Sequence, residues 1–102
     1  MGSYRGRLDI IADILSAASS EAKKTQIMYQ ANLSFKVLQK YLAEVVGASL
    51  VYFENAKQCY RVTDKGRRFL DAYGRYSKTS KHVEKRLNDV ATKKKTLEDL
   101  CL

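Results

Sequence analysis

The segment TQIMYQANLSFKVLQKYL, residues 25–42, determines the fold that this chain can adopt. Its first part predicts a short helix over about 25–31, with apolar side chains facing inward. Thr25 is expected to help cap the start of that helix. The residues Asn-Leu-Ser at 32–34 then interrupt the helical pattern. The segment therefore begins as a short helix followed by a tight turn.

A longer helix is expected directly after this turn. Ser34 is a favourable cap for it, and the helical pattern runs from Phe35 to about Val46. Its inward side chains recur at positions i, i+4 and i+7, and they are Leu38, Leu42 and Val45. Its polar side carries Lys36, Gln39 and Lys40. A short helix, a tight turn and a longer helix with a basic face are typical of a helix-turn-helix.

The flanking segments extend this unit to a winged helix. Upstream, residues 7–18 carry apolar side chains at helical spacing, namely Leu8, Ile11, Ile14 and Leu15. After Gly47 the pattern becomes typical of strands over 50–53 and 58–62, and a polar turn at 54–57 separates them. Three helices followed by a two-stranded hairpin follow the order of a winged helix-turn-helix.

A long helix is expected to complete the chain. It starts near residue 64, and no proline interrupts it. One face carries a seam of residues spaced 4-3-4-3, the 3.5-residue repeat of a coiled coil: Phe69, Tyr73, Tyr76, Ser80, Val83, Leu87, Val90, Lys94, Leu97 and Cys101. Ser80 and Lys94 are polar exceptions. The alternative is a single amphipathic helix folded back on the domain, but a helix of roughly 50 Å extends well beyond a domain of about 60 residues.

These patterns predict a mostly α (α+β) protein in three parts. We expect a flexible basic N-terminus at residues 1–6, a winged helix-turn-helix domain at 7–70 and a dimerisation helix at 71–102, continuous with the helix that starts near 64. The homodimer contact is expected to be a coiled coil formed by Tyr73, Tyr76, Val83, Leu87, Val90 and Leu97.

The charge of the chain points to a polyanionic partner. Nineteen Lys and Arg residues oppose eleven Asp and Glu residues, which gives a formal net charge of +8. This excess favours nucleic acid, an anionic membrane surface or an acidic protein, although a basic surface is also compatible with solubility alone. No run of about 18 apolar residues predicts a membrane span, and the N-terminus lacks the apolar stretch of a secretion signal. We therefore expect an intracellular protein with no membrane partner.

Two stretches carry a resemblance to a known family. Residues 25–42 and the segment YRVTDKGRRFL, residues 60–70, resemble archaeal winged-helix DNA-binding proteins, and most of all the ten-kilodalton winged-helix chromatin proteins of Sulfolobus. The resemblance covers the architecture from Leu8 to Val90. It implies a dimeric DNA-binding protein whose last helices form an antiparallel coiled coil. The family usually has Gly at the position of Ser49, which leaves the register of the wing open.

A helix-turn-helix binds DNA because an α-helix fits the major groove, where its first turns reach base edges and phosphates. Gln39 can pair with adenine, and the nearby lysines can contact guanine or phosphate. The preceding helix offers hydroxyl and amide groups to the backbone, and the wing offers side chains to the minor groove. The candidate DNA-binding residues are Thr25, Gln26, Tyr29, Ser34, Lys36, Gln39, Lys40, Asn55, Lys57 and Arg61.

Several of these residues also have a plain structural interpretation. The polar face of the longer helix could be merely solvated, and Tyr29 could belong to the core. Arg5 and Arg7 could form a basic arm or a frayed terminus. The basic residues of the long helix could solvate a coiled coil or hold a second DNA segment. Of the two cysteines, Cys59 is expected in the core, and two cysteines with one histidine do not suffice for a four-ligand zinc site.

The sequence contains no pattern typical of catalysis, such as a nucleophile triad, paired carboxylates or a phosphate loop. We therefore expect no enzyme activity, no cofactor, no metal and no small-molecule substrate. The favoured function is a chromatin- or nucleoid-organising dimer in the cytoplasm, with weak to moderate sequence preference on double-stranded DNA. The alternatives are a sequence-specific transcriptional regulator of the same fold, a winged-helix protein-interaction module and, less favoured, an RNA-binding protein.

Overall fold

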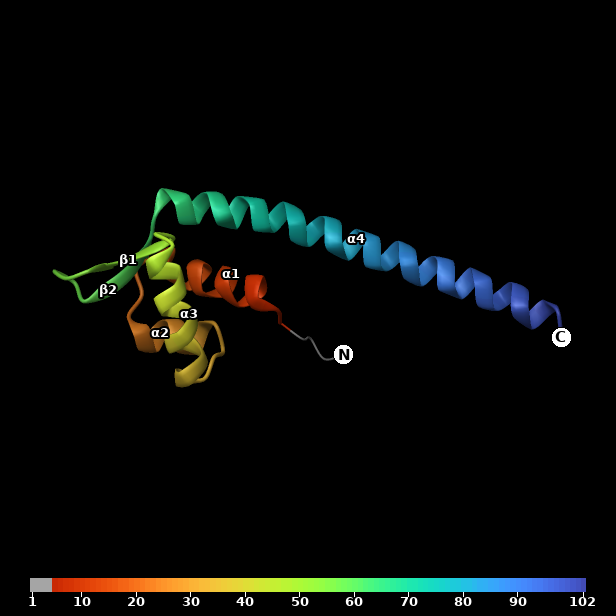
Figure 1. The fold of residues 1–102 in the computed structure, drawn as a ribbon, viewed down its shortest axis with the longest axis horizontal. Coiled ribbons are helices and arrows are strands. Elements are labelled where there is room, and N and C mark those ends of the chain that lie inside the picture. Colours follow the sequence, from red (N-terminus) through yellow and green to blue (C-terminus); the bar gives the residue numbers. More distant parts are fainter. Residues whose placement is uncertain (1–4) are drawn as a thin grey trace.

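The elements follow one another in the order that the sequence predicts. A computed structural model describes residues 5–102. It contains three short helices, a two-stranded antiparallel sheet and one long helix (Figure 1): α1 (Arg7–Ala18), α2 (Lys24–Gln30), α3 (Phe35–Gly47), β1 (Val51–Glu54), β2 (Cys59–Val62) and α4 (Asp64–Leu100). The predicted mostly helical winged helix-turn-helix with a long C-terminal helix is confirmed.

Helix α1 lies at the centre of the domain. It contacts α2, α3, β2 and the start of α4, so each of these elements packs against it. The largest side chains that are almost completely buried form the centre of the core: Ile14, Leu15, Ile27, Leu38, Val45 and Val51. Cys59 is also buried, as expected. The predicted inward stripe of α3 is therefore part of one continuous core with α1 and the sheet.

The turn between α2 and α3 is closed by backbone hydrogen bonds. The Asn32 amide donates to the Tyr29 carbonyl at 3.2 Å, and the Leu33 amide donates to the Met28 carbonyl at 3.0 Å. This pattern is a Schellman motif, which places Asn32 in the left-handed region with φ 53°. Asparagine tolerates that region better than most residues other than glycine.

The predicted N-cap of α3 is confirmed, whereas the predicted N-cap of α2 is wrong. The Ser34 hydroxyl accepts a hydrogen bond from the Val37 amide at 3.3 Å, so Ser34 caps α3 as predicted. Thr25 does not cap α2. The helix starts one residue earlier, at Lys24, and the Gln26 side chain accepts a hydrogen bond from the amide of Lys23, the N-cap residue, at 2.8 Å. A side chain reaching backward from the first turn replaces the expected hydroxyl.

The connection from α3 to the wing explains why glycine suits position 49. Ser49 adopts φ 62°, and a second Schellman motif forms there, since the Leu50 amide donates to the Val45 carbonyl at 2.9 Å. The chain therefore takes a left-handed turn without glycine. The register of the wing follows, with Val51 opposite Val62 and both side chains buried.

The wing differs from its predicted boundaries by one residue. Glu54 pairs with Cys59 in the ladder, so the turn covers residues 55–58 and ends at Gln58, which has φ 51°. An isolated antiparallel β-bridge also joins β2 to the loop before α2. Ala22 and Tyr60 exchange backbone hydrogen bonds of 3.1 and 2.8 Å, which ties that loop to β2.

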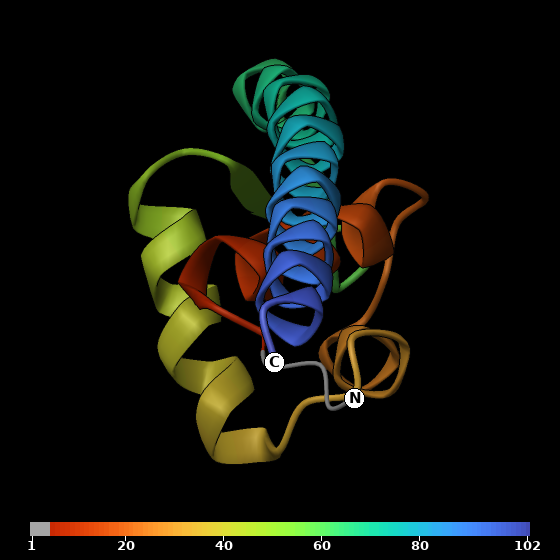
Figure 2. The same cartoon turned by 90° about the vertical axis from the view of Figure 1, so that its right-hand side faces the viewer.

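Helix α4 projects far beyond the domain (Figures 1 and 2). It has 37 residues, and the Thr63 hydroxyl caps its start by accepting from the Gly66 amide at 3.0 Å. The molecule measures 70 × 26 × 20 Å. Every residue from 81 onward is exposed, so the alternative of a helix folded back on the domain is wrong. Within residues 5–102, no helix is long and apolar enough to cross a membrane.

Gly66 allows α4 to approach the wing closely. A Cβ at this position would overlap the backbone carbonyl of Leu50 and a methyl group of Val62. We expect Gly66→Ala to lower the free energy of unfolding by about 1–3 kcal/mol, because backbone rather than a flexible side chain blocks the methyl group. Urea denaturation at one fixed protein concentration measures this change.

Gly74→Ala is the matched control, since it makes the same change in the same helix. A Cβ at Gly74 would meet no atom within 4 Å. Alanine there should raise the free energy of unfolding by about 0.5–1 kcal/mol through its higher helix propensity. Equal effects of the two substitutions would contradict the close approach at Gly66.

Candidate nucleic-acid interface

The outer face of α3 presents the polar residues that the sequence predicts. Lys36, Gln39 and Lys40 are all exposed and lie opposite the buried stripe of the same helix. Ser34 precedes them at the start of the helix, where its hydroxyl acts as the cap. In the part of the chain that the structure describes, neither lysine forms an ion pair, so both charges are directed to solvent. The Lys40 ammonium lies 5.3 Å from the centre of the Tyr41 ring.

Helix α2 adds exposed groups next to this face. Thr25, Gln26 and Tyr29 are exposed, and 78% of Tyr29 is accessible, so the alternative that Tyr29 belongs to the core is wrong. The side-chain oxygen of Gln26 accepts a hydrogen bond from the backbone amide of Lys23. The side-chain nitrogen of Gln26 therefore remains as a donor.

Two further residues of this surface escape prediction from sequence. The Lys24 ammonium lies 4.6 Å from the centre of the Phe35 ring, and Phe35 is 56% exposed. This cation–π contact joins the start of α2 to the start of α3. In the sequence, an aromatic residue directly after a capping serine resembles an ordinary core residue. The exposure of Phe35 is therefore seen only once α2 and α3 are placed in the structure.

The basic residues of the wing are paired with acidic ones. The Lys57 ammonium lies 3.0 Å from a Glu21 carboxylate oxygen, and the Arg61 guanidinium lies 3.4 Å from Glu54. The hydrogen bond with Lys57 lowers the pKa of Glu21, and the same bond raises the pKa of Lys57. Lys57 is therefore held beside the loop before α2 rather than projecting freely. Asn55 lies in the turn, where its carbonyl accepts from Gln58.

An open groove separates α3, the recognition helix of the helix-turn-helix, from the wing. Its volume is about 480 Å³, and apolar side chains dominate its lining: Lys24, Gln39, Leu42, Ala43, Val46, Gly47 and Tyr60. Gln39 of α3 and Lys24 of α2 therefore line the same groove as Tyr60 of β2. The structure brings the start of α2 close to α3, since Lys24 contacts Phe35 and lines the groove with Gln39. The wing cations Lys57 and Arg61 are instead paired with Glu21 and Glu54.

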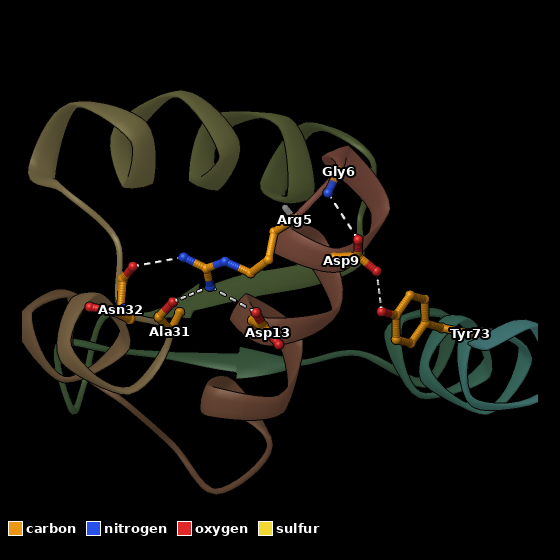
Figure 3. Close-up of polar contacts among 7 residues, drawn as sticks. All are labelled: Arg5, Gly6, Asp9, Asp13, Ala31, Asn32 and Tyr73. Atoms are coloured by element: carbon orange, nitrogen blue, oxygen red, sulfur yellow. Dashed lines mark hydrogen bonds and ion pairs between the residues drawn. The ribbon is translucent and has the colours of Figure 1, made fainter. Parts of the chain in front are cut away.

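Arg5 fastens the N-terminus to the helix-turn-helix (Figure 3). Its guanidinium donates to Asp13 at 2.9 Å, to the Ala31 carbonyl at 2.5 Å and to the Asn32 carbonyl at 2.8 Å. Residues 1–4 of the predicted flexible N-terminus lie outside the described residues. Arg5 itself is bound, because it satisfies carbonyls that the end of α2 leaves without a helical partner. The basic-arm and frayed-terminus interpretations are therefore both wrong for Arg5.

Arg7 also stays within the domain. It forms an ion pair with Glu44, which joins the first turn of α1 to α3. Arg7 thus contacts α3 directly, whereas Arg5 contacts the turn that precedes it.

A polar contact fixes α4 to α1 (Figure 3). The Tyr73 hydroxyl donates to Asp9, whose other carboxylate oxygen accepts from the Gly6 amide at 2.9 Å. This hydrogen bond raises the pKa of Tyr73 to about 12, since the phenol is the donor, and it lowers the pKa of Asp9. Tyr73 was predicted at the dimer seam, and its hydroxyl is used within the chain.

The apolar side chains of the seam are partly exposed to solvent in the described chain. Next to the domain, the seam forms one wall of a small apolar pocket lined by Leu8, Phe69, Ala72, Tyr73 and Tyr76. Farther along, between 49% and 66% of each of five side chains is exposed: Tyr76, Val83, Leu87, Val90 and Leu97. A row of large apolar side chains on one helix face is typical of a protein interface.

Over the described range 5–102, no group of three or more His, Cys, Asp or Glu side chains is placed to hold a metal ion.

The fold and this surface together define a winged helix-turn-helix protein. A winged helix-turn-helix family model matches residues 4–81, so the chain belongs to this family. Among solved structures, it is similar to Sso10a-2, a DNA-binding protein from Sulfolobus solfataricus, at 26% sequence identity and a TM-score of 0.77. The match covers 85% of this chain and 94% of that one. No curated protein sequence shows a significant match. The resemblance to Sulfolobus winged-helix proteins is confirmed.

The Arg5 contacts generate a stability prediction. We expect Arg5→Ala to lower the free energy of unfolding by about 1.5–3 kcal/mol, because hydrogen bonds that involve a charged group are lost and two carbonyls lose their donor. The measurement is the midpoint of urea denaturation, read with an unchanged slope.

Arg7→Ala provides the comparison, because it removes an equal charge two residues away. The Arg7–Glu44 pair is exposed, with 62% of the arginine side chain accessible. Its loss should change the free energy of unfolding by less than about 1 kcal/mol. If Arg5→Ala lowered the free energy of unfolding no more than Arg7→Ala, the stabilising role of Arg5 at the α2–α3 turn would be refuted.

Proposed function

We propose that this protein binds double-stranded DNA through the outer face of α3 and acts as a homodimer that organises DNA in the nucleoid. The observation that carries the proposal is the exposed set Lys36, Gln39 and Lys40 on the recognition helix of a winged helix-turn-helix. A helix of this kind fits the major groove. The description of Sso10a-2 as a DNA-binding protein supports the same function here.

The chemistry of the surface favours phosphate contacts over base readout. Lysine acts as a point charge, whereas arginine reads guanine through two parallel hydrogen bonds, and α3 offers lysines. The net charge of +8 adds a general attraction to polyanions. We therefore infer affinity that depends steeply on salt and a weak to moderate sequence preference, which suits a nucleoid-organising role.

The exposed seam of α4 supports dimerisation through a coiled coil. Its apolar side chains recur at the 3.5-residue period that two supercoiled helices share. The pocket beside Tyr76 and Leu8 continues the seam to the domain, so a second helix could cover both. A solitary helix would leave these side chains in water.

Lys94 favours the antiparallel arrangement. In a parallel dimer in register, the two Lys94 side chains would face each other within the seam, where like charges repel. An antiparallel pair centred near residue 85 instead places Lys94 opposite Tyr76 of the second copy, where the ammonium can lie against the ring. Each winged domain then sits at one end of the rod, which suits a protein that joins separate stretches of DNA.

The first test is binding to random-sequence duplex DNA over a series of salt concentrations. We expect Lys36→Ala/Lys40→Ala to weaken binding about tenfold or more near 0.1 M salt. It should also reduce the slope of log affinity against log salt by about 0.9 for each lost phosphate contact. Fluorescence anisotropy of a labelled duplex measures both quantities.

Lys93→Ala/Lys95→Ala is the control, since it removes the same charge from an exposed site on α4 far from α3. It should change the slope much less. Tight binding to one selected operator with little binding to random duplex would favour the regulator instead. Binding to neither would contradict DNA binding and favour the interaction module.

The strand direction can be tested with the native cysteines. Cys59 is buried and Cys101 is exposed at the end of the seam. In the antiparallel dimer the two Cys101 residues lie about 48 Å apart, whereas a disulfide requires Cα atoms within about 7 Å. Mild oxidation of dilute dimer should therefore give no Cys101 crosslink on a non-reducing gel. Rapid crosslinking that Cys101→Ser abolishes would establish the parallel arrangement.

A further inference from the structure

The side of α4 opposite the seam carries a concentrated positive charge in its first half. Counting around the helix at the 3.5-residue period, six basic residues lie on this side, which we call the outer stripe: Arg67, Arg68, Arg75, Lys78, Lys81 and Lys85. Asp71 is the acidic residue among them. The stripe is about 27 Å long, from the rise of 1.5 Å per residue.

No ion pair within the described residues neutralises this concentration of charge. All six residues of the outer stripe are exposed. Within the described part of α4, the ion pair recorded is Lys94–Glu98, which lies outside the stripe. Farther along, the same side of the helix carries Asp89, Lys95 and Asp99, a mixture of signs that is sufficient for solubility. The excess of positive charge is therefore confined to the half of α4 nearest the domain.

The outer stripe points away from the domain. The opposite side of the same helix segment makes the contacts with the domain, since Gly66 lies against Leu50 and Tyr73 donates to Asp9 of α1. The first half of α4 and the N-terminal half of α3 lie on opposite sides of α1 in both views (Figures 1 and 2). A straight duplex seated on the N-terminal half of α3 would therefore lie on the opposite side of α1 from the stripe.

We propose that the outer stripe is a second DNA-binding site, which holds the phosphate backbone of a duplex other than the one on α3. This inference rests on the proposed binding of DNA through α3, because that binding brings DNA to the molecule. A duplex suits the stripe because its contacts would be purely electrostatic: the apolar side chains of α4 lie on the far side of the helix. Each protomer would then hold DNA on two opposed faces.

The test removes the first site in order to see the second. In the full-length Lys36→Ala/Lys40→Ala protein, residual binding to a labelled 20-bp random duplex is measured by anisotropy over a salt series. Adding Lys81→Gln/Lys85→Gln should weaken this residual binding about tenfold or more and reduce the salt slope by up to about 1.8. Adding Lys93→Gln/Lys95→Gln, with equal charge loss on the same helix, should have a much smaller effect.

Two further measurements complete the design. Circular dichroism and sedimentation verify that each variant keeps its helix and its oligomeric state. A biotinylated duplex on beads reports whether the protein retains a second, labelled duplex, and Lys81→Gln/Lys85→Gln in the otherwise native chain should reduce that retention while leaving α3-dependent binding to a single duplex unchanged.

The outcomes separate this proposal from the one on which it rests. If Lys36→Ala/Lys40→Ala leaves binding unchanged, DNA binding through α3 fails. The outer stripe is overturned if residual binding vanishes in that variant, or if the two glutamine pairs weaken it equally. Binding to vesicles of anionic lipid that depends on Lys81 and Lys85, with no such dependence for the duplex, would reassign the stripe to a membrane surface.

Discussion

The burial of α1 is the constraint on which the rest of the structure depends. Ile14 and Leu15 are completely buried, and the helix-turn-helix, the wing and α4 all pack against the helix that carries them. Because α1 separates the N-terminal half of α3 from the first half of α4, it also sets the two basic surfaces on opposite sides of the domain. Apolar packing around α1 thus sets the orientation of the basic faces of α3 and α4, although the charged residues of the two faces do not contact one another.

The sequence predicts the parts of this structure that depend on local patterns. Helical periodicity located α3 and the seam, and the serine cap of α3 was correct, because each of these signals lies within a few residues. The exposed lysines of α3 followed from the same periodicity. The order of a short helix, a tight turn and a longer helix was predicted as well, since it follows from the same local patterns.

Contacts between distant residues escaped prediction. Arg5 reaches carbonyls 26 and 27 residues away, and Tyr73 reaches Asp9 across 64 residues. The pairing of Lys57 with Glu21 spans 36 residues and changes a candidate DNA contact into a partner of the preceding loop. No spacing rule connects such residues, because three-dimensional packing alone brings them together. The exposure of the α3 candidates was therefore predicted correctly, whereas the ion pairing of the wing candidates was not.

The left-handed turns have a consequence for how this protein can adapt. Glu21, Asn32, Ser49 and Gln58 all have positive φ, whereas none of the glycines in the described range does. Holding a residue other than glycine in that region costs about 1 kcal/mol, somewhat less for asparagine. Each turn is therefore a place where a single codon change to glycine can release strain. All four residues lie outside α3 and α4, so relief of backbone strain in these turns need not alter the residues of either proposed DNA contact.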